Sequence, residues 1–86
     1  MMFMEFIVER ITKDSDVTIA KVDDFEEVCK IMQDDAFTNY PKDAEICKWE
    51  ELICDVCDSF RINNEFIMKL ISVTYRVAID YDESKN

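Results

Sequence analysis

The sequence predicts a small α+β domain, in which an antiparallel sheet carries two helices on one face in the order β-β-α-α-β. An apolar stretch at residues 2–12 and a β-branched one at 17–22 flank a polar turn and predict a hairpin. Within residues 23–60, apolar residues at steps of three and four predict two helices. Alternating apolar residues over 71–81 predict a final strand. At 86 residues the chain is expected to form one domain.

The hairpin is expected to fill residues 1–22. The first strand is apolar on both alternating faces as far as Val8, which suits a strand buried on both sides, although its apolar residues also fit one helical face. Residues 13–16 have the composition of a turn, and the β-branched residues that follow favour a second strand.

Two amphipathic helices are expected next. Asp23 or Asp24 can cap a first helix that ends near Ala36, and Pro41 suits the first turn of a second helix over about 42–60. The apolar stripe of the first helix is Phe25, Val28, Cys29, Met32 and Ala36. The stripe of the second helix is Ile46, Trp49, Ile53, Val56 and Phe60.

The C-terminal segment, residues 61–81, is expected to contain a turn at 61–64 and then one strand. Residues 66–78 also fit a helical period, so an all-α bundle is the alternative fold. The β-branched residues favour the strand, whose odd-numbered side chains would join the helix stripes in one core. Residues 82–86 are expected to be a frayed tail.

Negative charge is concentrated in the predicted helical region. Between Asp23 and Asp58 there are twelve acidic residues and three lysines, and the whole chain has a formal net charge of −10. Such a chain is repelled by nucleic-acid phosphates and by anionic membranes, and it has no basic patch to offset this. The charge instead favours a basic protein as partner.

The residues predicted to bind this partner are acids on the exposed sides of both helices and two aromatic residues between them. Solubility alone is the simpler explanation of such acids, but like charges three or four residues apart cost about 0.2–0.5 kcal/mol per pair. About one net charge per 6 Å of helix compares with one per about 1.7 Å of duplex DNA, so imitation of DNA would be partial. The predicted contacts are Glu26, Glu27, Asp34, Asp35, Asp43, Glu50, Glu51, Asp55, Asp58, Phe37 and Tyr40.

Catalytic and cofactor functions are not expected. Histidine, the usual general base, is absent, and without glycine no phosphate-binding loop of the usual kind can form. Cys54 and Cys57 have the spacing of zinc and redox sites, and Cys29 and Cys47 would complete four ligands. Because the pair lies within a predicted helix, packing is the preferred interpretation, with no metal and no cofactor.

The cellular location is expected to be the cytoplasm. The apolar start of the chain lacks a positive n-region and contains Glu5, so it does not resemble a signal peptide, and no stretch is long enough to span a membrane. The four cysteines are then expected to be reduced.

In size, charge and lack of catalytic residues, the chain resembles small acidic phage-encoded inhibitors, the class that includes anti-CRISPR proteins and DNA mimics. The class shares no motif, so no functional residues are carried over. The resemblance implies a stoichiometric viral inhibitor, acting in the host cytoplasm, that occupies the nucleic-acid groove of a defence or DNA-processing protein. The alternative is a small structural subunit or homodimer that uses the first strand as an exposed edge, with the acids serving solubility.

Overall fold

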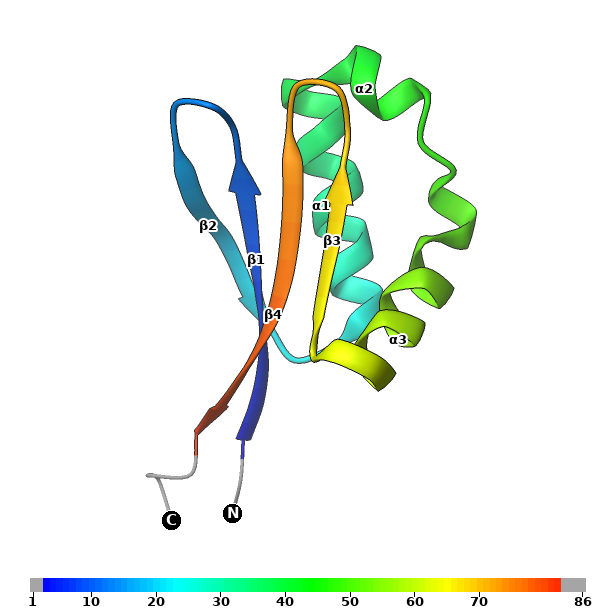
Figure 1. Cartoon of the computed structure of the whole chain (residues 1–86). Helices are drawn as coiled ribbons and strands as arrows, with labels where there is room; N and C mark the ends of the chain where they lie inside the picture. The colour runs from blue at the N-terminus through cyan, green and yellow to red at the C-terminus, as the bar shows by residue number, and fades with distance from the viewer. Residues whose placement is uncertain (1–2, 83–86) are drawn as a thin grey trace.

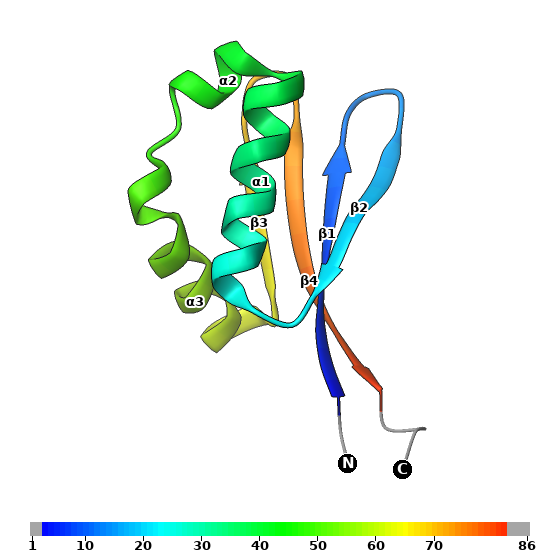
Figure 2. The same cartoon turned by 180° about the vertical axis from the view of Figure 1, so that it is seen from behind.

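The computed structural model describes residues 3–82 and has a four-stranded antiparallel sheet in the order β2-β1-β4-β3. The helices cover one face of this sheet and leave the other open (Figures 1 and 2). The predicted α+β class is confirmed. The elements are β1 (Phe3–Ile11), β2 (Asp16–Val22), α1 (Phe25–Asn39), α2 (Pro41–Glu45), the 3-10 turn η1 (Trp49–Glu51), α3 (Leu52–Asn63), β3 (Glu65–Lys69) and β4 (Thr74–Asp82).

The hairpin β1-β2 and helix α1 form where the sequence predicts them. The Asp24 side chain caps α1 by accepting a hydrogen bond from the Glu26 amide at 3.4 Å. The stripe residues Val28, Met32 and Ala36 are fully buried against the sheet. Pro41 occupies the first turn of the next helix, as expected.

The predicted helix over residues 42–60 is wrong, because the chain breaks after Glu45. The short helix α2 buries Asp43, whose carboxylate accepts a hydrogen bond from the Ser72 amide at 2.6 Å. The Trp49 indole then donates to the Ala44 carbonyl at 2.8 Å, which holds the chain in a turn. Ile46 is consequently 62% exposed, and the buried residues of α3 are Leu52, Val56 and Phe60.

The predicted single strand after the turn at 61–64 is also corrected, since α3 continues to Asn63 and a hairpin follows. Asn64 ends the helix in the left-handed region, with φ 56°. Leu70 donates to the Val73 carbonyl at 2.9 Å and closes the β3-β4 turn. The alternation is confirmed in β4, where Tyr75 and Val77 are buried. Residues 83–86 of the expected tail lie outside the described residues.

From Phe6 to Ile11, strand β1 is central and not an exposed edge, because it pairs there with both β2 and β4. Its Phe6 side chain packs with Phe25 of α1 and Phe60 of α3, at ring centroid distances of 4.5 and 5.5 Å. The stretch Phe6–Ile11 of β1 is therefore not available as an edge for a homodimer. Within the described residues, the edges of the sheet are β2 and β3.

On the open face, charges from three strands pair with one another. The Arg76 guanidinium of β4 contacts Glu9 of β1 at 2.6 Å and Glu65 of β3 at 2.5 Å. These hydrogen bonds raise the pKa of Arg76. The open face thus neutralises part of its own charge.

Candidate functional site

The helical layer carries most of the exposed negative charge. Its acids outnumber its bases, since only Lys30, Lys42, Lys48 and Arg61 oppose them. We call this layer's exposed acids the acidic surface. They are Asp23, Asp24, Glu26, Glu27, Asp34, Glu45, Glu50, Glu51, Asp55 and Asp58.

Asp35, one of the predicted contacts, is engaged inside the protein. Its carboxylate contacts the Arg10 guanidinium at 2.6 Å and accepts a hydrogen bond from the Tyr75 hydroxyl at 2.6 Å. Burial, and then this hydrogen bond, raises the pKa of Tyr75 far above its ordinary value. Asp35 therefore ties α1 to β1 and β4, and we assign it a structural role.

Asp43 is likewise structural. It is 4% exposed, and its hydrogen bond to Ser72 joins α2 to the β3-β4 turn. A carboxylate this deeply buried offers no charge to a partner, so Asp43 leaves the set of binding candidates.

The other acids among the predicted contacts separate into two groups. Glu26, Glu27 and Asp34 are exposed on α1. A second group, which we call the α3 acids, comprises Glu50 and Glu51 of η1 with Asp55 and Asp58 of α3.

Two of the α3 acids, Glu50 and Asp55, lie near Cys47. Burial, and then the charges of Asp55 and Glu50, raises the pKa of the Cys47 thiol, so both carboxylates lie close to it. Among residues 3–82, the only basic contact of the α3 acids is Arg61, which is 3.6 Å from Asp58 and largely exposed. An exposed pair of this kind neutralises little.

The two aromatic candidates differ in exposure. Phe37 is 45% exposed, and its ring centroid is 6.0 Å from that of Trp49. Tyr40 is only half-buried but packs against the core. Of the two predicted aromatic residues, Phe37 is thus the more exposed.

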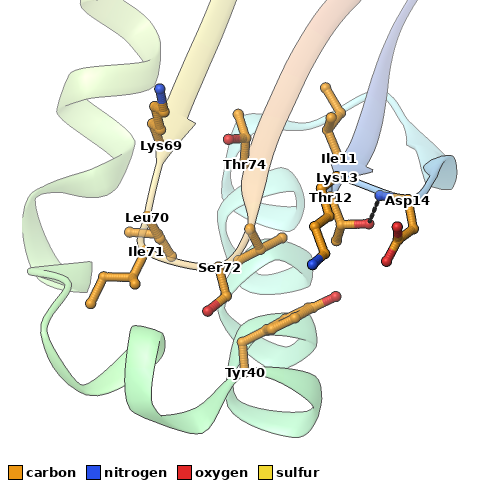
Figure 3. A pocket seen from close by; sticks show the side chains of 11 residues that line it. Ile11, Thr12, Lys13, Asp14, Tyr40, Lys69, Leu70, Ile71, Ser72 and Thr74 are labelled. Atoms are coloured by element: carbon orange, nitrogen blue, oxygen red, sulfur yellow. Dashed lines mark hydrogen bonds between the residues drawn. The ribbon is translucent and has the colours of Figure 1, made fainter.

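A pocket of about 590 Å³ lies between the two hairpin turns and Tyr40. Its walls combine apolar residues such as Ile11 and Leu70 with hydroxyl groups. Lys13 and Lys69 both line it, but their side chains point in different directions (Figure 3). They do not form a joint site for one anion, and we assign the pocket no ligand.

Cys29, Cys47 and Cys57 are partly buried, whereas Cys54 is exposed. Burial, followed by nearby Cys57 and Asp24, raises the pKa of the Cys29 thiol to about 11. The Cys47 thiol contacts the Met68 sulfur at 3.6 Å. No group of three or more His, Cys, Asp or Glu side chains among residues 3–82 is placed to hold a metal ion.

These environments predict the order of thiol alkylation. Cys54 is exposed, so iodoacetamide at mildly alkaline pH should modify it first, as read by mass spectrometry of peptides. Cys29 should react at least about tenfold more slowly, because its raised pKa leaves little thiolate. Equal rates would contradict the packing of Cys29, and modification in urea should abolish the difference.

Charge and periodicity identify most of the acidic surface, but Asp23, Asp24 and Glu45, which are also exposed, are not among the predicted contacts. No helix in the described part of the chain is long and apolar enough to cross a membrane. Comparison with protein-family models, with curated proteins and with solved structures found no match.

Proposed function

We propose that this protein is a non-catalytic binding protein that docks its acidic surface on a lysine- and arginine-rich surface of a partner protein. A partner that uses this surface to bind nucleic acid would be blocked from doing so. The observation that supports the proposal is the uneven distribution of charge: ten exposed acids lie on the helical layer, whereas Arg76 on the open face is shared by two glutamates.

Charge density favours a protein partner with a restricted basic patch. Helix α1 is about 22 Å long and presents three acids along its exposed side, whereas duplex DNA of that length carries about thirteen phosphates. The acidic surface therefore resembles DNA in the sign of its charge but not in the spacing of its charges. Its main effects would be fast encounter and salt-sensitive affinity.

Charge reversal tests this proposal. Replacing the four α3 acids, Glu50, Glu51, Asp55 and Asp58, by lysine should abolish capture of the partner from a cell lysate at low salt. The matched control reverses four exposed acids elsewhere and changes the net charge equally: Glu5, Asp14, Asp16 and Asp80 to lysine. Duplex DNA added as a competitor should release the captured partner.

The outcomes separate the proposal from simple solubility. Loss of capture only in the α3 variant supports an acidic docking surface. Equal loss in both variants would show that net charge alone matters, and unchanged capture in both would overturn the proposal. Circular dichroism of each variant checks that the fold is retained.

A further inference from the structure

The outer edge of strand β3 presents free backbone groups. Leu70 donates to the Val73 carbonyl directly opposite it, and in an antiparallel ladder such hydrogen-bonded pairs alternate with non-bonded pairs. By the register of the hairpin, the backbone N–H and C=O groups of Phe66 and Met68 point towards β4, whereas those of Ile67 point away from the sheet. No described strand pairs with this edge.

One contact of Glu65 agrees with this alternation of inward- and outward-pointing backbone groups. By the same register, the backbone groups of Glu65 also point away from β4, and the Ser59 hydroxyl of α3 donates to the Glu65 carbonyl. The backbone groups of Lys69, at the other end of the strand, point outward as well. The backbone groups of Ile67 and Lys69 are therefore open to an added strand.

The helical layer extends beyond this edge of the sheet. In both views the segment 46–51 lies to the side of β3, outside the sheet (Figures 1 and 2). The contact between Cys47 and Met68 joins this segment to the helix-facing side of β3. A further strand at the usual spacing of about 4.8 Å would lie over the segment.

Three of the α3 acids lie on the same side: Glu50 and Glu51 belong to the segment 46–51, and Asp55 follows in α3. Cys57 faces α1, since it contributes to the raised pKa of the Cys29 thiol. Asp55 and Ile62 lie about 150° around α3 from Cys57, so they face away from α1 and towards the free edge. This side of the helical layer is therefore acidic.

Exposed apolar side chains accompany the edge. Ile67 is 56% exposed in β3 itself, Ile62 at the end of α3 is 80% exposed, and Ile71 in the following turn is 77% exposed. The opposite edge strand β2 differs, because its register with β1 shifts between Val8 and Glu9. Such a bulge discourages the addition of a strand.

From these observations we infer that an extended, lysine- or arginine-containing segment of a partner protein adds to β3 as a fifth strand. Backbone hydrogen bonds to Ile67 and Lys69 would hold it, and its basic side chains would reach Asp55 and Asp58. A second copy of this chain fits less well, because it would bring two sets of α3 acids together. This inference rests on the proposed function and specifies how the acidic surface is used.

Amide hydrogen exchange tests the inference with a defined probe, a blocked hexapeptide of alternating valine and lysine. In the free protein the amides of Ile67 and Lys69 should exchange rapidly, while those of Phe66 and Met68 are protected by β4. Saturating peptide should slow exchange at Ile67 and Lys69 by about tenfold or more. A peptide with N-methylated backbone groups and the same charge should give no such protection.

The outcomes distinguish this inference from the proposed function. Binding of both peptides, abolished by reversal of the α3 acids but without protection at Ile67, would overturn strand addition and leave the acidic docking surface intact. Equal binding of a valine–glutamate peptide would overturn both proposals. Protection of Ile67 in the free protein that grows with protein concentration would assign the edge to a second copy and overturn the inference.

A substitution gives a second test. Ile67→Pro removes an outward N–H and no hydrogen bond to β4, so the fold should persist, as shown by unchanged protection of the Val77 amide. Its affinity for the valine–lysine peptide should fall by about tenfold. Ile67→Thr, which keeps the N–H, is the matched control and should bind within about threefold of the original protein. Equal affinity of all three proteins would overturn the inference.

Discussion

Replacing Asp35 by alanine should lower the free energy of unfolding by about 3 kcal/mol, measured by urea titration. Asp35 is the shared partner of the Arg10 guanidinium and the Tyr75 hydroxyl. Without it, Tyr75, which is 0% exposed, keeps an unpaired hydroxyl, and Arg10 loses its counter-charge. Because the Arg10 side chain is 25% exposed, water offsets part of the cost, which places the value at the low end for a broken buried pair.

The neighbouring residue provides the control. Asp34 lies on the same helix but is exposed, so Asp34→Ala should change the free energy of unfolding by no more than about 0.5 kcal/mol. Asp35→Asn keeps an acceptor for Tyr75 and should fall between the two. If Asp35→Ala were as stable as Asp34→Ala, the assigned role of the Arg10–Asp35–Tyr75 network would be wrong.

This pair of variants also separates stability from binding. Asp34→Ala removes a charge from the acidic surface, so it should modestly lower the affinity for a basic partner without destabilising the fold. Asp35→Ala should affect binding only through loss of folded protein. A domain of this size has a total stability of about 4–13 kcal/mol, so the second effect is large.

The first half of the fold could be predicted because its signals are local. The hairpin has a polar turn between two apolar strands, and α1 has both a capping aspartate and a regular stripe. Each feature depends on residues that are close in sequence. The central position of β1 could not be predicted in this way, since it depends on pairing with β4.

The break between α2 and α3 depends on distant contacts. The periodic apolar residues run without interruption from Ile46 to Phe60, and no glycine or second proline marks a stop. The helix ends because Asp43 binds the β3-β4 turn and Trp49 returns to Ala44. Tertiary hydrogen bonds here override a local helical pattern.

Strand β3 was missed because its turn has no turn-forming composition. Leu70, Ile71 and Val73 continue the apolar pattern of the flanking strands, and only Ser72 is polar. The apolar alternation of β4 therefore continues through the turn without a signal that marks it. The free edge next to the α3 acids could consequently not be predicted from the sequence, although the acids themselves were predicted contacts.

Phe6→Ala should remove about 4 kcal/mol of stability, measured as the free energy of unfolding in urea. Phe6 is 1% exposed, and its ring packs against Phe25 of α1 and Phe60 of α3. Truncation therefore loses apolar burial and leaves a cavity at the point where both helices meet the sheet. The loss approaches the whole stability expected for a marginal domain of this length.

Two further variants test whether the loss of stability depends on the volume removed and on the burial of the site. Phe6→Leu keeps most of the volume and should cost about 1–2 kcal/mol, while Ile62→Ala, at an 80% exposed site, should change stability by about 0.5 kcal/mol or less. A cost below about 1 kcal/mol for Phe6→Ala would contradict the aromatic cluster. Because this cluster attaches both acid-bearing helices to β1, Phe6→Ala should lower partner capture, without altering any charge, in proportion to the folded protein that is lost. Ile62→Ala, beside the free edge of β3, should instead weaken capture while the fold remains intact.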